Sequence, residues 1–335
     1  MRLGLALPHY DFSFADGRPV TWERLRSWGR VAEDLGFGSA WISDHFYLSL
    51  ERYGGRDEPY GTPEALTALA ALATITSSVR LGTLVLSAGF RHPALLAKSA
   101  TVIDLLSGGR FDLGIGAGWY EDEYRAFGYR YEDVGGRFDV LEESLIVLGH
   151  LLADGPASWR GERFSLDGAY NRPAPAQRPR PPIWVGGKGG PRLQRLVARH
   201  ADGWNTVWAW SPERYALKVE ELRETCEREG RDPDSVRLSL GLYLAIGRDE
   251  GEVRALLERY AERVPGGLPS AGSLEEWRAD RLAGTPDEIL ERLGAFAELG
   301  VEEVIVSPAA VPFAVHDEDA LAHFAEAVIP AARDL

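Results

Sequence analysis

An aspartate and a histidine stand side by side directly after a short apolar run. Ala40, Trp41 and Ile42 are followed by Ser43 and then by the Asp44–His45 pair. A neighbouring carboxylate raises the basicity of an imidazole, so this pair could serve acid–base chemistry. Adjacent residues need not touch each other, however. A second interpretation is that Asp44 caps a helix or ties down a loop while His45 lies on the surface.

A second cluster of interest is glycine-rich and follows another apolar run. Gly114, Gly116 and Gly118 are spaced G-x-G-x-G, which lacks the third glycine at the offset of a dinucleotide-binding motif. The spacing is a poor signature of a nicotinamide site. It favours positions where the missing side chain lets a flat ring or a neighbouring backbone come close.

The segment GGKGG, from Gly186 to Gly190, stands between an apolar run and Pro191. Proline is common at the first position of a helix, where free backbone N–H groups attract anions. The segment is therefore the best phosphate candidate in the chain, with an ordinary structural turn as the other interpretation. It is not a Walker A loop, because glycine follows Lys188 where Ser or Thr would bind Mg²⁺.

Other chemistries lack support. The seven histidines show no H-E-x-x-H or paired spacing, and no G-x-S-x-G motif occurs. The single cysteine, Cys226, stands between charged residues of a helical segment. We therefore expect neither a metal site nor a serine or cysteine hydrolase.

These candidate residues need elements to position them, and short apolar runs alternate with helical patterns along the whole chain. Strands are expected at residues 3–8, 39–43, 80–86, 111–115, 183–185, 203–207, 236–246 and 301–307. Helices are expected at residues 21–35, 62–76, 93–106, 136–152, 191–200, 212–229, 285–300 and 318–332. Eight such units predict a single (β/α)8 TIM barrel over residues 1–335, with insertions near 46–61, 154–182 and 262–284. The candidate residues then meet at the C-terminal ends of the strands, where such barrels hold their sites.

The amino-acid composition disfavours some classes of binding partner. The 335 residues carry 37 Lys and Arg against 51 Asp and Glu, a net charge of −14 that disfavours nucleic acid and anionic membranes. One cysteine excludes an internal disulfide, and the apolar run at residues 3–7 is too short for a signal peptide or a membrane span. We expect a cytoplasmic protein with a small-molecule substrate.

Four stretches resemble the luciferase-like flavin and deazaflavin oxidoreductases, and within them the F420-dependent branch. The stretches are VAEDLGF (31–37), WISDHF (41–46), the segment 79–119, and PPIWVGGKGGPRLQRLVARHADGWN (181–205). The resemblance implies a bacterial-luciferase-like barrel, a homodimer, and hydride transfer between C5 of the deazaflavin F420 and a small organic substrate. The alternative that it leaves open is a monooxygenase that uses reduced FMN and O₂.

The resemblance also implies roles for individual residues. His45 and Asp44 would be catalytic, beside the ring system, and a non-prolyl cis peptide is expected between Leu84 and Val85 at the back of the ring. The cofactor-binding residues would be Leu84, Val85, Ser87, Gly116, Trp119, Gly186, Gly187, Lys188 and Gly189. Arg192 and Arg195, with Lys188, could receive the acidic tail of F420.

Two departures from the sugar-phosphate dehydrogenases of this branch bear on the substrate. Trp119 stands where those enzymes have an acidic residue, and Ser49 stands where they have a tryptophan. Glucose 6-phosphate is therefore not the expected substrate. Glu121 or Asp122 could supply the missing proton, or either could cap the following helix.

Overall fold

Eight parallel strands form a closed ring in the computed structural model, which describes residues 1–264 and 274–335. The strands are β1 (Arg2–Ala6), β2 (Ser39–Ile42), β5 (Arg80–Thr83), β7 (Phe111–Gly116), β10 (Ile183–Gly186), β11 (Gly203–Trp208), β12 (Arg237–Ile246) and β14 (Val301–Ser307). Each strand pairs with the next in this order, and β14 pairs with β1 to close the ring. The expected (β/α)8 barrel is confirmed.

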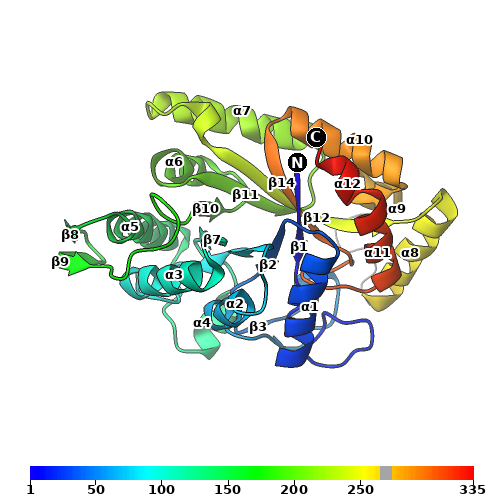
Figure 1. The fold of residues 1–335 in the computed structure, drawn as a ribbon, viewed down its shortest axis with the longest axis horizontal. Helices are drawn as coiled ribbons and strands as arrows, with labels where there is room; N and C mark the ends of the chain where they lie inside the picture. Colours follow the sequence, from blue (N-terminus) through cyan, green and yellow to red (C-terminus); the bar gives the residue numbers. More distant parts are fainter. Residues whose placement is uncertain (265–273) are drawn as a thin grey trace.

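Helices surround the strands (Figure 1). The principal helices are α1 (Trp22–Asp34), α2 (Ala65–Ala73), α3 (Pro93–Ser107), α5 (Val134–Leu152), α6 (Pro191–His200), α7 (Pro212–Arg228), α10 (Pro286–Glu298), α11 (Glu318–Ala327) and α12 (Ile329–Ala332). Capping residues and prolines in the sequence predicted where most of these helices begin; one example is the capping box of Thr285 and Glu288 at α10. The start of α2 was predicted too early, because Glu64 and not Thr62 caps it, through a 2.7 Å bond from the Thr67 N–H.

The three expected insertions carry small elements of their own. The first holds the antiparallel pair β3 (Tyr47–Leu48) and β4 (Tyr60–Gly61), with a short 3₁₀ helix, Glu51–Tyr53, between them. The second holds the hairpin of β8 (Pro156–Arg160) and β9 (Ser165–Tyr170), which lies beside α5 at one edge of the molecule (Figure 1).

The third insertion is described only in part, since residues 265–273 lie outside the described residues. It includes α9 (Leu274–Ala279) and β13 (Leu282–Gly284), which pairs with β12. Three further elements were not predicted: β6 (Leu86–Ser87), α4 (Glu121–Ala126) and α8 (Glu250–Arg263).

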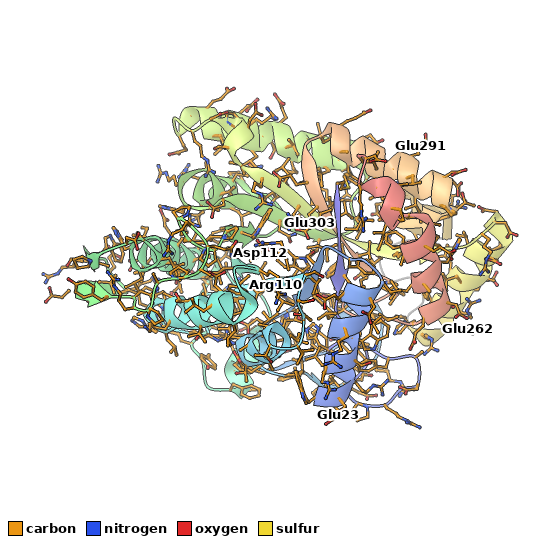
Figure 2. The ribbon with its side chains drawn as sticks, viewed as in Figure 1. Glu23, Arg110, Asp112, Glu262, Glu291 and Glu303 are labelled. Carbon is orange, nitrogen blue, oxygen red and sulfur yellow. The ribbon has the colours of Figure 1, made fainter. Side chains whose placement is uncertain are left out.

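Buried charges occupy the N-terminal end of the barrel. Figure 2 shows Asp112 and Glu303 near the centre of the molecule, whereas exposed acids such as Glu23 lie at the periphery. Asp112 pairs with Arg80 at 2.6 Å, and burial raises the pKa of Glu303. These groups close the barrel floor, so a ligand site is left to the opposite, C-terminal end, which we call the mouth.

None of the described helices has the length and apolar character needed to cross a membrane. Within the same residues, no group of three or more His, Cys, Asp or Glu side chains could hold a metal ion.

Candidate active site

A histidine and a buried carboxylate form a pair at the mouth of the barrel. Nδ1 of His45, in the loop after β2, lies 2.7 Å from Oε1 of Glu123 on α4. The other oxygen of Glu123 accepts the N–H of Phe46 at 2.9 Å, and the Glu123 residue is only 1% exposed. A carboxylate accepts hydrogen bonds, so Nδ1 of His45 carries a hydrogen. Nε2 is then the nitrogen left for chemistry, since no hydrogen bond engages it among the described residues.

Glu123 was missed by the sequence reasoning, which pointed to Glu121 and Asp122 instead. Glu121 forms an ion pair with Arg125 one turn along α4, and Asp122 is exposed to solvent. The signal that could have found Glu123 is its neighbour Tyr124, which is 1% exposed and marks the inward face of this short helix.

Asp44 and His45 are adjacent but do not act on each other through a hydrogen bond. Asp44 accepts two bonds from Arg91, at 2.6 and 2.8 Å, and the backbone N–H of Ser87 at 3.0 Å. The sequence left open whether Asp44 serves acid–base chemistry or holds a loop in place, and these contacts favour the second interpretation. Asp44 joins the end of β2 to β6 through these bonds, and its catalytic role stays a prediction. His45, in contrast, lies at the mouth with a side chain 13% exposed.

The expected cis peptide between Leu84 and Val85 is confirmed, and a second one, Val207–Trp208, was not predicted. The Val85 side chain occupies space that three glycines leave free. A Cβ on Gly114, Gly116 or Gly186 would lie 2.9, 3.0 or 2.7 Å from a Val85 methyl group. These glycines therefore let Val85 sit between β7 and β10, as expected for positions that admit a close neighbour.

Ser87 was expected to contact the cofactor. Its hydroxyl is hydrogen bonded to the Tyr124 hydroxyl, beneath Gly118. The role of Ser87 toward a cofactor stays a prediction, since its hydroxyl keeps further hydrogen-bonding capacity beside the bond to Tyr124.

The GGKGG segment links β10 to α6 and leaves the start of α6 open. The N–H of Gly187 donates to the Asn205 carbonyl at 3.0 Å, and the Trp204 indole donates to the Gly187 carbonyl at 3.0 Å. Gly190 is the N-cap residue, and no side chain caps the helix. Each of the other described helices of eight or more residues has a capping side chain. The exposed N–H groups suit a phosphate.

The space in front of α6 also suits a phosphate. A Cβ built on Gly190 meets no atom within 4 Å, whereas one on Gly187 would lie 2.7 Å from Cδ1 of Leu193. Gly189 has a positive φ of 74° and would meet the Trp204 ring at 3.0 Å. The glycines at 187 and 189 are thus needed by the loop itself, and Gly190 borders free space.

The basic residues near this loop are arranged differently from the expectation. Arg192 pairs with Asp139, and Arg195 lies 3.7 Å from a Glu229 oxygen, so both are engaged by carboxylates. The Lys188 ammonium donates to the Val207 carbonyl and lies 5.5 Å from the centre of the Trp210 ring. Its partial removal from water, followed by the charges of nearby arginines, lowers the pKa of Lys188 to about 8.

His9 follows β1 and is a structural residue. It donates from Nδ1 to the Leu7 carbonyl at 2.7 Å, while Nε2 accepts the Ser43 N–H at 3.2 Å. Burial lowers the pKa of His9 to about 3, so its ring is neutral at physiological pH. Nε2 of His45, in contrast, has no hydrogen-bond partner among the described residues.

A closed β/α barrel with a His–Glu pair and an open helix N-terminus at one end suits an enzyme that binds an anionic ligand. Residues 1–303 match the family described as luciferase-like monooxygenase. The chain belongs to this family.

Individual relatives are similar over most of the chain. An F420-dependent glucose-6-phosphate dehydrogenase of Amycolatopsis mediterranei is 27% identical over 327 residues, which cover 91% of this chain and 92% of that protein. A phthiodiolone/phenolphthiodiolone dimycocerosates ketoreductase of Mycobacterium bovis is 30% identical over 249 residues, covering 70% of this chain and 64% of that protein. Among solved structures, an F420-dependent secondary alcohol dehydrogenase in complex with an F420-acetone adduct has a TM-score of 0.76 at 21% identity, covering 99% of each chain. That likeness supports the fold.

Proposed function

We propose that the protein is an F420-dependent oxidoreductase that transfers a hydride between the deazaflavin C5 and a small organic substrate. The observation that carries the proposal is that the His45–Glu123 pair and the uncapped start of α6 lie at the same end of one barrel. Curated relatives of the same length are F420-dependent dehydrogenases, which supports this cofactor.

The residues at the mouth fit such a cofactor. When bound, the deazaflavin supplies or accepts the hydride. The N–H groups at the start of α6 would hold its phosphate, with Gly186, Gly187, Lys188 and Gly189 forming the loop around it. The backbone at Leu84, Val85, Ser87 and Gly116 would lie against the ring, and Trp119 would border it.

The proton that accompanies the hydride belongs to His45. Nε2 would take the proton from a substrate hydroxyl, or return it to a carbonyl oxygen in the opposite direction. Glu123 holds the Nδ1 hydrogen and compensates the positive charge that the ring gains. Asp44 would hold the backbone around Ser87 in place by accepting the Ser87 N–H, and bonds from Arg91 fix the Asp44 carboxylate.

The alternative is an FMN-dependent monooxygenase, because FMN also carries a ribityl phosphate that the α6 terminus could bind. Titration of the protein with F420 and with FMN by calorimetry separates the two. Micromolar or tighter binding of F420 supports the proposal, whereas binding of FMN without binding of F420 refutes it.

The phosphate assignment has its own test at Gly190. A Gly190→Asp change places a carboxylate on the free N–H groups, which caps α6 and occupies the phosphate position. We expect the unfolding free energy to rise by roughly a few tenths of a kcal/mol, while F420 affinity falls at least about 100-fold through charge repulsion. Gly190→Ala is the matched control and keeps the affinity within about threefold, since a Cβ there meets nothing. Unchanged F420 binding by a capped Gly190→Asp protein would show that the loop is only a turn.

The remaining expectations belong to the same proposal. The chain forms a single domain over residues 1–335, acts as a homodimer in the cytoplasm, and uses a small-molecule substrate other than glucose 6-phosphate. Size-exclusion chromatography with light scattering tests the dimer directly.

A further inference from the structure

One helix around the barrel, α3, carries large apolar side chains on its outer face. Its buried positions pack onto the barrel core. Four of its five exposed residues are also apolar, and the fifth is Lys98. The four are Leu95, Val102, Leu105 and Leu106, which are 61%, 46%, 41% and 46% exposed. A helix that is apolar on all sides is normally covered on all sides, so this face requires a partner.

The charged residues of α3 are engaged within the chain. The Lys98 ammonium donates to the Arg172 carbonyl. Asp104 is fully buried, and its carboxylate accepts the backbone N–H and the side-chain amide of Gln177. On α1, in contrast, four of the six exposed residues are charged, as is usual for a helix that faces water. The outer face of α3 therefore differs from that of a solvent-facing helix of the same barrel.

The exposed apolar residues of α3 form a ridge. Leu95, Val102 and Leu106 are spaced i, i+7 and i+11, so they lie along one line of the helix, which we call the α3 ridge. The neighbouring helix α2 packs against α3 on the outside of the barrel (Figure 1). Its outward positions, including the C-cap, hold only small uncharged residues: Thr67, Ala70, Ala71 and Thr74. A ridge of large side chains thus stands beside a row of small ones.

We propose that two copies of this chain associate through the outer faces of α2 and α3. After a twofold rotation, the α3 ridge of each copy meets the row of small residues on α2 of the other, so the face is complementary to itself. This inference names the contact surface of the homodimer in the proposed function and rests on that homodimer.

Charge favours a second copy over other occupants. The chain has a net charge of −14, so two copies repel each other over most of their surface. No acidic residue is exposed on α2 or α3, and the two copies can meet there without opposing carboxylates. Homodimer interfaces are also more apolar than the rest of a protein surface. An anionic membrane would require several cations on this face, which has only Lys98.

The proposed contact lies on the side of the barrel and leaves the mouth open. Each helix follows its strand and runs back from the mouth toward the barrel floor, so the outer faces of α2 and α3 do not border the mouth from above. Separated chains should therefore still bind F420. Association and cofactor binding can be measured independently of each other.

Analytical ultracentrifugation of the Val102→Arg variant tests the contact. Val102 lies in the middle of the α3 ridge, and each copy would bring a guanidinium to an apolar face. We expect the parent to sediment as a dimer, and the dissociation constant of the Val102→Arg dimer to be at least about 100-fold higher. Leu217→Arg is the matched control, because Leu217 is 67% exposed on α7, and its dissociation constant should equal that of the parent. Urea unfolding and calorimetric F420 binding check that each variant is folded.

A cysteine variant tests the same face without disturbing the dimer. The natural Cys226 is buried, so a cysteine introduced at the surface is the thiol that a maleimide reaches. Both Val102 and Leu217 are exposed in the single chain. In the dimer, Val102→Cys should be labelled at least about tenfold more slowly than Leu217→Cys.

Each possible failure has a separate meaning. A dimer that tolerates Val102→Arg, or equal labelling of the two cysteine variants, would overturn the α2–α3 contact. A parent chain that sediments as a monomer would overturn both this contact and the homodimer, while the F420 assignment would stand. A dimeric parent that does not bind F420 would refute the proposed cofactor and leave the contact in place.

Discussion

The Glu123→Gln variant tests the proposed proton chemistry most sharply. Glutamine has the size of glutamate but carries one acceptor oxygen and one NH₂ donor. The N–H of Phe46, 2.9 Å from the present carboxylate, requires the acceptor. The NH₂ group then faces Nδ1 of His45, which must give up its hydrogen and accept. The hydrogen of the neutral ring moves to Nε2, and the ring loses the carboxylate that compensates its positive charge.

The size of the effect follows from the bond that is lost. A hydrogen bond to a charged group contributes about 1.5–3 kcal/mol, more than a neutral one. If this hydrogen bond stabilises only the positively charged ring that forms during the reaction, its loss lowers kcat about 10- to 150-fold. Complete removal of the imidazole in His45→Ala should cost about 10²- to 10⁴-fold, the usual range for general acid–base groups. Cofactor affinity should change little in either variant.

Two measurements decide the outcome. Proton–nitrogen correlation spectra of the histidine rings report which nitrogen carries the hydrogen, without any substrate. We expect Nδ1–H in the parent and Nε2–H in Glu123→Gln, with kcat reduced as above. Glu121→Gln is the control, because Glu121 lies on the same helix but pairs with Arg125 at the surface. A variant with the parental ring form and parental kcat would refute the role of Glu123.

Three further predictions follow from the contacts at the mouth. Asp44→Asn should lower the unfolding free energy by about 1–3 kcal/mol, because it weakens the bonds from the partly buried Arg91 and leaves Glu64 as the remaining carboxylate on this arginine. Urea unfolding should show no such loss in Asp122→Asn, an exposed site. The unfolding free energy should fall as the pH drops from 6.5 toward 3, and His9 should contribute about 1.4 kcal/mol per pH unit. The reason is that His9 takes up a proton near pH 6.5 in the unfolded chain, but only near pH 3 in the folded protein. Urea unfolding of His9→Gln should show a shallower decline over this range, and equal slopes would contradict the assignment. Lys188→Ala should weaken F420 binding about two- to threefold at low salt and not measurably in about 0.5 M salt; a calorimetric loss that persists in salt would indicate a buried contact instead.

Much of the fold was predictable because its signals are local. The capping box at Thr285 and Glu288 and the proline at the start of α6 are set by residues within one helical turn. The period of each strand and helix is likewise a property of a few neighbouring residues. The Gly186–Gly190 segment combined two local signals, a strand end and a helix start, so its place at the mouth was predicted correctly.

Contacts between distant parts of the chain were beyond that reasoning. Asp44 could be recognised as a polar residue at a strand end, but its partner Arg91 stands 47 residues away. The glycines of β7 could be predicted to admit a neighbour, yet only the structure identifies that neighbour as Val85. Arg192 and Arg195 have the charge for an acidic tail, but Asp139 and Glu229 on other helices engage them.

The sequence by itself therefore determined the eight β/α units, the end of the barrel that carries the site, and His45 and the α6 loop as its candidates. The tertiary structure alone decided that Glu123, and not Glu121 or Asp122, meets His45. Three acidic residues in a row look alike in a sequence. Closure of the barrel brings α4 over the end of β2, 78 residues earlier, and only the side chain on the inward face of that helix is buried against the imidazole.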